Sequence, residues 1–371
     1  MRDTMGIIIT TDDRIPPITD LRAVGALPIA GGYRMIDFIL SNMANANIIN
    51  IGVITESNYS SLMDHLKSGS PWDLDRKNYG LNILPPNMAS FNYFTGRGDL
   101  DRLAGARQFL RKSQQTYVIL STDNLIYNID FEDVMEKHIE NQSDITVVYK
   151  DMTGTPEAEL SRHTLIELDE HNRITDIEVN PQYPKSSKAS LEVYVMEKAL
   201  LESIIDECVA RGEHCFVRDG LSKKLSGMNI NGYKFCGYCD KIDSLKSYFK
   251  NNMLFLKEDF RNELLNPDNP VYTKNKDLAP TIYKENSNVE NSLISNGCLI
   301  EGTVKNSVLA RGVVVKKGAV IKNSIIMQDS VIEENASLDC VILDKEVTVS
   351  KDKKLVGQKS YPVAIAKGST V

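Results

Sequence analysis

The chain has 371 residues, of which 42% are hydrophobic and 25% charged, and its formal net charge is −7 at pH 7. This composition is typical of a folded globular protein of two or three domains, and the acidic balance argues against nucleic acid or a membrane surface as partner. We see no signal-peptide core and no apolar run long enough to span a membrane. Six cysteines without a signal peptide indicate reduced thiols, so we expect a cytoplasmic protein.

The first two thirds of the chain alternate strand-like and helix-like patterns. Strands are predicted at 5–10, 48–55, 116–121 and 145–149, and helices at 34–46, 60–67, 98–113 and 131–141. A hairpin is expected at 163–179, followed by helices at 197–211 and 244–256. This order predicts a mostly parallel sheet flanked by helices, with ligands at the carboxyl ends of its strands. The turns after Thr10 and Ser121 are therefore the first places to look for a site.

The last third differs from the rest of the chain in composition and in hydrophobic periodicity. The segment NPDNPVYTKNKDLAP, residues 266–280, is rich in Pro and Asn and is typical of a linker. Beyond it, apolar positions recur every six residues, with a slip of one residue in mid-repeat, at Leu309, Val315, Ile321, Ile326, Ile332 and Leu338. A period of six predicts a parallel β-helix, and we favour it over a sandwich of short strands.

Four features then point to one family. The stretches YRMIDFILSNMANANIINIGVIT, SGSPWDLDRKNYGLNILPP and VILSTDNLIY, followed by the C-terminal repeats, resemble the ADP-glucose pyrophosphorylases (glucose-1-phosphate adenylyltransferases) of glycogen synthesis. The resemblance covers nearly the whole chain. It implies a Rossmann-like nucleotidyltransferase domain over 1–258, a linker over 259–284 and a left-handed parallel β-helix over 285–371. It also implies tetramers that use Mg²⁺ to make ADP-glucose and pyrophosphate from ATP and glucose 1-phosphate.

The phosphate-binding loop of that family departs most from its pattern here. The family's loop reads GGxGxRLxxLT, whereas this chain has Thr10, Thr11, Asp12 and Asp13 before Arg14. Glycines let a backbone approach phosphates closely, and none remains. Asp12 also brings negative charge toward a negative ligand. Arg14 is either a phosphate contact or one half of a surface ion pair.

Other phosphate-binding positions of the family are also changed. Two lysines that follow the loop are replaced by Val24 and Gly32, and the lysine of the family's VEKP stretch is replaced by Asn180. Two arginines, Arg34 and Arg97, are retained in stretches that match the family. They are our candidates for binding a phosphorylated regulatory metabolite.

The carboxylates are partly retained. Asp101 and Asp123 stand at family positions, and an Asp at a strand end, as Asp123 is expected to be, suits Mg²⁺. The alternative role of Asp123 is to stabilise a turn. The second metal-binding aspartate of the family aligns with Tyr238, with Asp240 two residues further on. We therefore expect no cofactor on this chain by itself, with Asp123 as metal ligand at most and Mg²⁺ in a catalytic partner.

A CxxC motif, CGYC, spans Cys236 to Cys239. It invites a zinc or redox interpretation, but no second CxxC accompanies it. The pattern favours two ordinary thiols.

Loss of the glycine loop, of lysines and of a metal carboxylate predicts a chain that assists catalysis without performing it. We expect a regulatory, catalytically inactive subunit that forms a heterotetramer with a catalytic paralogue, or a homo-oligomer. Two alternatives stay open: a weakly active nucleotidyltransferase that uses Arg14, Asp101 and Asp123, and a stand-alone sensor of sugar phosphates or nucleotides. An acyltransferase is disfavoured because the repeats contain no histidine to act as the base.

Overall fold

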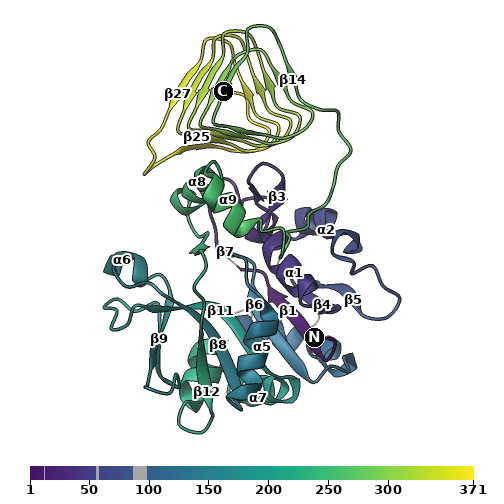
Figure 1. Ribbon diagram of the computed structural model, residues 1–371, viewed down its shortest axis with the longest axis vertical. Helices are drawn as coiled ribbons and strands as arrows, with labels where there is room; N and C mark the ends of the chain where they lie inside the picture. The colour runs from purple at the N-terminus through teal and green to yellow at the C-terminus, as the bar shows by residue number, and fades with distance from the viewer. Residues whose placement is uncertain (12, 56–57, 87–97) are drawn as a thin grey trace. The chain divides into compact units, whose positions relative to one another are not determined.

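The computed structural model describes residues 1–11, 13–55, 58–86 and 98–371. The chain divides into two compact units, shown with the course of the chain in Figure 1. The first unit comprises Met1–Thr11, Ile39–Tyr59 and Lys67–Cys239, and the second comprises Asp12–Phe38, Ser60–Leu66 and Asp240–Val371. Among the described helices, none has the length and apolar character needed to cross a membrane.

The first unit is built on a nine-stranded sheet. Its strands are β1 (Thr4–Ile9), β4 (Asn50–Ile54), β5 (Gly80–Leu84), β6 (Tyr117–Thr122), β8 (Ile145–Asp151), β9 (Thr164–Leu168), β10 (Ile174–Val179), β11 (Lys188–Glu197) and β12 (Ile230–Lys234). The main path runs β10-β9-β11-β6-β1-β4-β5, and β8 pairs with both β11 and β12. The predicted strands at 5–10, 48–55 and 116–121 correspond to β1, β4 and β6, which are parallel as expected, and β5 extends this parallel set. The expected hairpin is β9–β10. Strand β11 runs antiparallel to β6 and β8, so the complete sheet is mixed.

Helices cover both faces of this sheet. They are α3 (Asp99–Gly105), α4 (Arg107–Lys112), α5 (Phe131–Glu140), α6 (Glu157–Leu160) and α7 (Lys198–Ala210), with a π-helical turn (Phe216–Leu221) and a short 3₁₀ turn (Ser70–Trp72). Helices α3, α4 and α7 pack on the face that carries Ile7 and Leu120. The opposite face carries α1 (Met35–Asn45), whose Met43 lies against Gly6, and α5, whose His138 bonds Thr146 on β8. Successive side chains of a strand point to opposite faces, so the sheet has a hydrophobic core on each face.

One predicted helix is wrong in its continuity. Residues 98–113 form two short helices that meet at Ala106, not one long helix. The break follows Gly105, which weakens a helix because glycine loses more backbone freedom on folding than other residues. The Ala106 N–H bonds two carbonyls at once, those of Arg102 and Leu103, as is common where a helix ends. The break directs α3 toward the loop after β1.

The second unit joins N-terminal elements to the C-terminal part of the chain. These elements are a 3₁₀ turn (Val24–Ala26), β2 (Pro28–Ile29), β3 (Tyr33–Arg34), α2 (Ser60–Leu66), α8 (Leu245–Leu254) and α9 (Glu258–Leu264). Helix α8 begins with a capping box in which Ser244 and Ser247 bond each other's backbone N–H groups. The Tyr248 hydroxyl donates to the Pro28 carbonyl, and the Asn252 side chain accepts from the Ala30 N–H. Residues from both ends of the sequence therefore share one core.

The repeats form a left-handed parallel β-helix with three five-stranded sheets. Its strands are β14 (Ile282–Tyr283), β15 (Asn288–Glu290), β16 (Leu293–Ile294), β17 (Leu299–Ile300), β18 (Thr303–Lys305), β19 (Val308–Leu309), β20 (Val314–Val315), β21 (Val320–Lys322), β22 (Ile325–Ile326), β23 (Val331–Ile332), β24 (Ser337–Asp339), β25 (Val341–Leu343), β26 (Thr348–Val349), β27 (Lys354–Val356) and β28 (Val363–Ile365). Figure 1 shows the coils stacked as triangles. The sequence slip explains the length of the central coils: Ile321 pairs with Leu338, 17 residues later, because one side of this coil is a residue short.

The corners of the β-helix need a left-handed backbone. One corner carries Asn306, Asn323 and Cys340 at φ of 45°, 45° and 54°, and another carries Gly318 and Asn335 at 76° and 58°. Gly and Asn adopt this conformation at the lowest cost. The buried apolar positions of the repeat point inward, where they form one continuous core.

Candidate functional site

The candidate site lies where β1 and β6 end side by side in the parallel sheet. Ile9 pairs with Thr122, so the loop after β1 and the turn after β6 are neighbours. Thr11 donates its backbone N–H and its hydroxyl to one carboxylate oxygen of Asp123, over 2.8 and 3.0 Å. Asp123 is fully buried. The N–H of Thr11, at the position where this fold offers donors to phosphates, is thus directed to the protein's own carboxylate.

A second internal contact engages the same loop. The Arg102 guanidinium, on α3, donates to the Thr10 carbonyl over 2.6 Å. The Thr10 hydroxyl is buried and has no hydrogen-bond partner in the described part of the chain. The long side chain of Arg102 reaches from α3 to the loop. The loop is therefore held from two sides, by Asp123 and by Arg102.

Asp101 and its neighbours form a polar cluster at the start of α3. Asp101 bonds Nδ1 of His214 at 3.0 Å, and the His214 carbonyl accepts from the Leu100 N–H. A Cβ on Gly98 would collide with that same carbonyl, which explains the glycine at this position. Asp99 accepts from the Phe216 N–H at 2.8 Å, and burial raises the pKa of the Asp99 carboxyl. Asp101 therefore ties α3 to the segment after α7.

Glu192 is a residue that the sequence does not single out. It lies within β11 at φ +54°, the one non-glycine residue with positive φ inside a described strand. The register of β11 against β8 shifts between Ser190 and Val193, so Glu192 occupies a β-bulge. Its carboxylate accepts from the Thr122 hydroxyl over 3.1 Å. Glu192 thus adds a negative charge one residue from Asp123, at a cost in backbone strain.

The carboxylates near this loop are engaged in contacts within the protein. Asp123 accepts two hydrogen bonds on one oxygen, and the Lys150 ammonium lies 5.7 Å from the ring centroid of Tyr238. Asp240 is bonded by Lys250 and Asn251, both on α8. Within the described residues, no group of three His, Cys, Asp or Glu side chains could hold a metal ion.

The substituted phosphate positions lie in varied surroundings. Val24 is buried in the short 3₁₀ turn, and Gly32 has no atoms within 4 Å of where a Cβ would stand. Asn180 is exposed, at φ +46° just after β10, and Arg14 is exposed. Asp13 is partly buried. Two further candidates, Asp12 and Arg97, lie outside the residues that the structure describes.

Arg34 lies in the second unit, near other basic side chains. It is 8% exposed, and its guanidinium donates to the Ala26 carbonyl. Burial, and then the charge of Arg22, lowers the pKa of Arg34 to about 10. Arg22 makes a two-point ion pair with Asp344 on the β-helix, at 2.7 and 3.0 Å, and both side chains are buried. The sequence gives no sign of this pair, because 322 residues separate its members.

Lys345 and Arg311 extend the cationic cluster on the β-helix. Burial and the charges of Arg34 and Arg22 lower the pKa of Lys345 to about 7. The Nε of Arg311 is buried and has no hydrogen-bond partner among the described residues. We call Arg22, Arg34, Arg311 and Lys345 the cationic cluster. Asp344 and Asp37 offset part of this positive charge, and the remaining cations are of the kind that bind anions.

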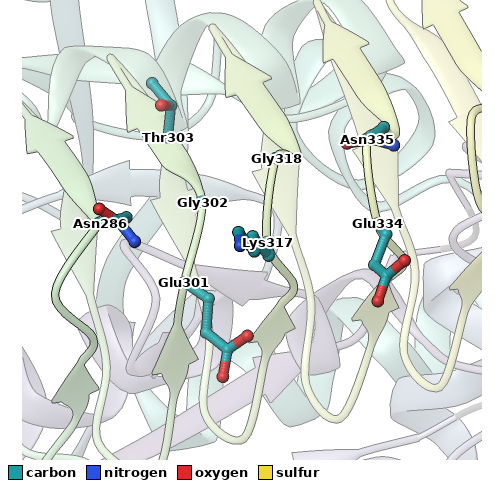
Figure 2. A pocket seen from close by; sticks show the side chains of 8 residues that line it. All are labelled: Asn286, Glu301, Gly302, Thr303, Lys317, Gly318, Glu334 and Asn335. Carbon is teal, nitrogen blue, oxygen red and sulfur yellow. The ribbon is translucent and has the colours of Figure 1, made fainter.

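A depression of about 540 Å³ also lies on the β-helix. Figure 2 shows that Glu301, Lys317 and Glu334 line it from successive coils. The charges along these coils alternate in sign, and Glu334 pairs with Lys351 at 2.9 Å. The depression therefore follows from stacked equivalent positions of the repeat, and we assign no ligand to it.

Comparisons with known proteins agree with this architecture. Residues 11–258 match the nucleotidyl transferase family, and residues 279–361 match the GlmU-like C-terminal hexapeptide family. The glycogen biosynthesis protein GlgD of Bacillus subtilis (strain 168) is 33% identical over 366 residues, which are 98% of this chain and 96% of GlgD. Glucose-1-phosphate adenylyltransferases of Bacillus thuringiensis (strain Al Hakam) and Bacillus anthracis are each 30% identical over 360 residues, 96% of this chain and 95% of theirs. The chain therefore belongs to the nucleotidyl transferase family, in the group that contains GlgD and the glucose-1-phosphate adenylyltransferases.

Proposed function

We propose that this chain is a regulatory, non-catalytic subunit of glucose-1-phosphate adenylyltransferase in glycogen biosynthesis, which acts on a catalytic paralogue. The observation that carries the proposal is the loop after β1. Its Thr11 N–H and its Thr10 carbonyl are bonded to Asp123 and Arg102 of the same unit. The Thr11 N–H and hydroxyl, which are both bonded to Asp123, are not available as donors to a nucleotide.

The electrostatics of the site support the same proposal. Transfer of a nucleotidyl group requires donors and cations around the phosphates, usually with a metal held by carboxylates. Here Glu192 adds negative charge beside Thr122, and Val24 and Asn180 stand where the family has lysines. The chain would thus rely on a partner for Mg²⁺ and for catalysis.

The proposed mode of action is a shift in the partner's conformational equilibrium. We expect a heterotetramer with the catalytic paralogue, in which this chain changes the partner's affinity for substrate or effector. The cationic cluster provides a receptor for a phosphorylated metabolite, since arginines bind phosphate oxygens in paired hydrogen bonds. Such a ligand would bind this chain and be detected through the partner's kinetics.

The decisive experiment measures ADP-glucose formation from ATP, glucose 1-phosphate and Mg²⁺. The chain alone should give no turnover above background, and adding it to the purified paralogue at rising ratios should change the paralogue's kcat or KM. Robust turnover by the chain alone, abolished by Asp123→Ala, would instead identify a weakly active enzyme. Ligand binding without any effect on, or association with, the paralogue would identify a stand-alone sensor.

The effector is tested with inorganic phosphate and a sugar bisphosphate as probes. Binding to the chain should weaken at least tenfold in Arg311→Met, a change that removes a side chain whose Nε has no partner in the described residues. The control is Arg76→Met, since Arg76 belongs to the first unit and its exposed guanidinium bonds the nearby Asp73. Equal binding by both variants would exclude the cationic cluster as the receptor.

A further inference from the structure

Two of the six cysteines form a pair that is open to solvent. Cys236 is exposed and Cys239 is partly exposed, whereas Cys208, Cys298 and Cys340 are buried. Cys236 lies in the connection that follows β12, Cys239 is the first residue of β13 (Cys239–Lys241), and both cysteines belong to the first unit. Reagents in solution therefore reach these two thiols together.

The connection between them is bent and anchored. The chain bends at Gly237, and a Cβ there would collide with the ring of Phe235. Three residue steps of fully extended chain span about 10 Å, whereas the Cα atoms of a disulfide lie about 4.4–6.8 Å apart. A bend between the cysteines shortens their separation toward that range. Glycine is the residue that the tight packing on Phe235 requires.

Two contacts fix this bend to the sheet. The Lys150 ammonium, on β8, donates to the Gly237 carbonyl over 2.6 Å. The Phe235 N–H donates to the Tyr149 carbonyl over 2.8 Å, and the Phe235 ring packs against Tyr127. Both residues between the cysteines are thus held, because the same ammonium lies over the Tyr238 ring. A held bend lowers the entropic cost of joining the two cysteines.

We propose that Cys236 and Cys239 are a redox-active dithiol, which small-molecule disulfides oxidise reversibly to an intramolecular disulfide. The Cys236 thiolate attacks one sulfur of the small disulfide, forming a mixed disulfide and releasing one thiolate. The Cys239 thiol loses its proton to solvent and attacks Cys236 Sγ, which releases the second thiolate. The protein loses two electrons and two protons, and the small disulfide is reduced to two thiols. This assignment is independent of the proposed regulatory function.

The test equilibrates the full-length protein in buffers of increasing oxidised-to-reduced glutathione ratio, with an acid quench. We expect the intact mass to fall by two hydrogen atoms, and peptide mapping to find one cross-link between Cys236 and Cys239. Excess dithiothreitol should restore the original mass. After oxidation, labelling of these two cysteines by iodoacetamide should fall at least tenfold.

Single variants separate the roles of the two thiols. Cys236→Ser and Cys239→Ser should each lose the cross-link and retain one glutathione on the remaining cysteine. The control is Cys215→Ser, a partly exposed cysteine outside the motif, which should cross-link as the unchanged protein does. Separate glutathione adducts on Cys236 and Cys239 in the unchanged protein, or a cross-link only between two molecules, would overturn the proposal.

Discussion

Thr11 donates two hydrogen bonds to a single carboxylate oxygen of Asp123, one from its backbone and one from its hydroxyl. Because Asp123 is fully buried, these bonds replace the water that an exposed carboxylate would bind. The pair ties the loop after β1 to the turn after β6. In this chain the strand-end aspartate therefore has a structural role that its position alone does not reveal.

The first prediction is that Asp123→Ala lowers the free energy of unfolding by about 1–3 kcal/mol, because it leaves the Thr11 N–H without its acceptor. Urea denaturation measures the change. Thr11→Val, which removes only the hydroxyl, should cost less. An Asp123→Ala protein of unchanged stability that loses Mg²⁺-dependent nucleotide binding would show that Asp123 is a ligand and not a tether.

Glu192 gives a prediction with a matched pair of variants. Both Glu192→Ala and Glu192→Gly remove the carboxylate that bonds Thr122, but only glycine adopts φ +54° without strain. The glycine variant should therefore be more stable than the alanine variant by about 1 kcal/mol. Equal urea midpoints would mean that the backbone at this bulge relaxes when the side chain is removed.

The sequence predicts those features that repeat or that belong to local patterns. The apolar spacing is one residue shorter before Ile326, and this shorter spacing reflects the 17-residue coil. Stacked coils must align their apolar positions, so the coil length sets the period of the sequence. The strand predicted at 116–121 is β6 (Tyr117–Thr122), one residue further on, and it follows from a run of β-branched and apolar residues. Local pattern is thus enough for most elements.

Features that depend on distant partners are not predictable in this way. Arg22 and Asp344 are 322 positions apart, and no local sequence pattern near either residue predicts that they pair. The strain at Glu192 arises from the pairing of β11 with its neighbours, which only the assembled sheet defines. The contact of Arg102 with the Thr10 carbonyl likewise depends on how α3 packs beside the loop.

A third prediction concerns the buried ion pair of the second unit. Arg22→Met should lower the free energy of unfolding by about 3–5 kcal/mol, because it leaves the Asp344 carboxylate buried without a counter-charge. The double variant Arg22→Met/Asp344→Asn should recover part of this loss, since no buried charge of the pair remains. Unfolding of all variants in urea gives the coupling energy. Additive losses would show that the pair is not coupled.

The last prediction is a pH dependence that originates at Lys345. Burial and the nearby charges of Arg34 and Arg22 hold the pKa of Lys345 at about 7 in the folded protein, well below the ordinary lysine value. Between about pH 7 and pH 10 the unfolded chain binds a proton at this lysine that the folded chain does not. Stability should therefore rise with pH in that window, by at most about 1.4 kcal/mol per pH unit from this group.

Three measurements check that slope. Lys345→Met should flatten the dependence of stability on pH above 7 and stabilise the protein below it, whereas Lys353→Met, at an exposed position, should leave the slope unchanged. Added inorganic phosphate should also flatten the slope, because an anion beside Arg34 and Arg22 favours protonated Lys345 and raises its pKa. Thermal or urea unfolding between pH 6 and pH 9, with and without phosphate, gives the result. An unchanged slope in Lys345→Met would locate the titrating group elsewhere, and a slope insensitive to phosphate would argue against anion binding at this cluster.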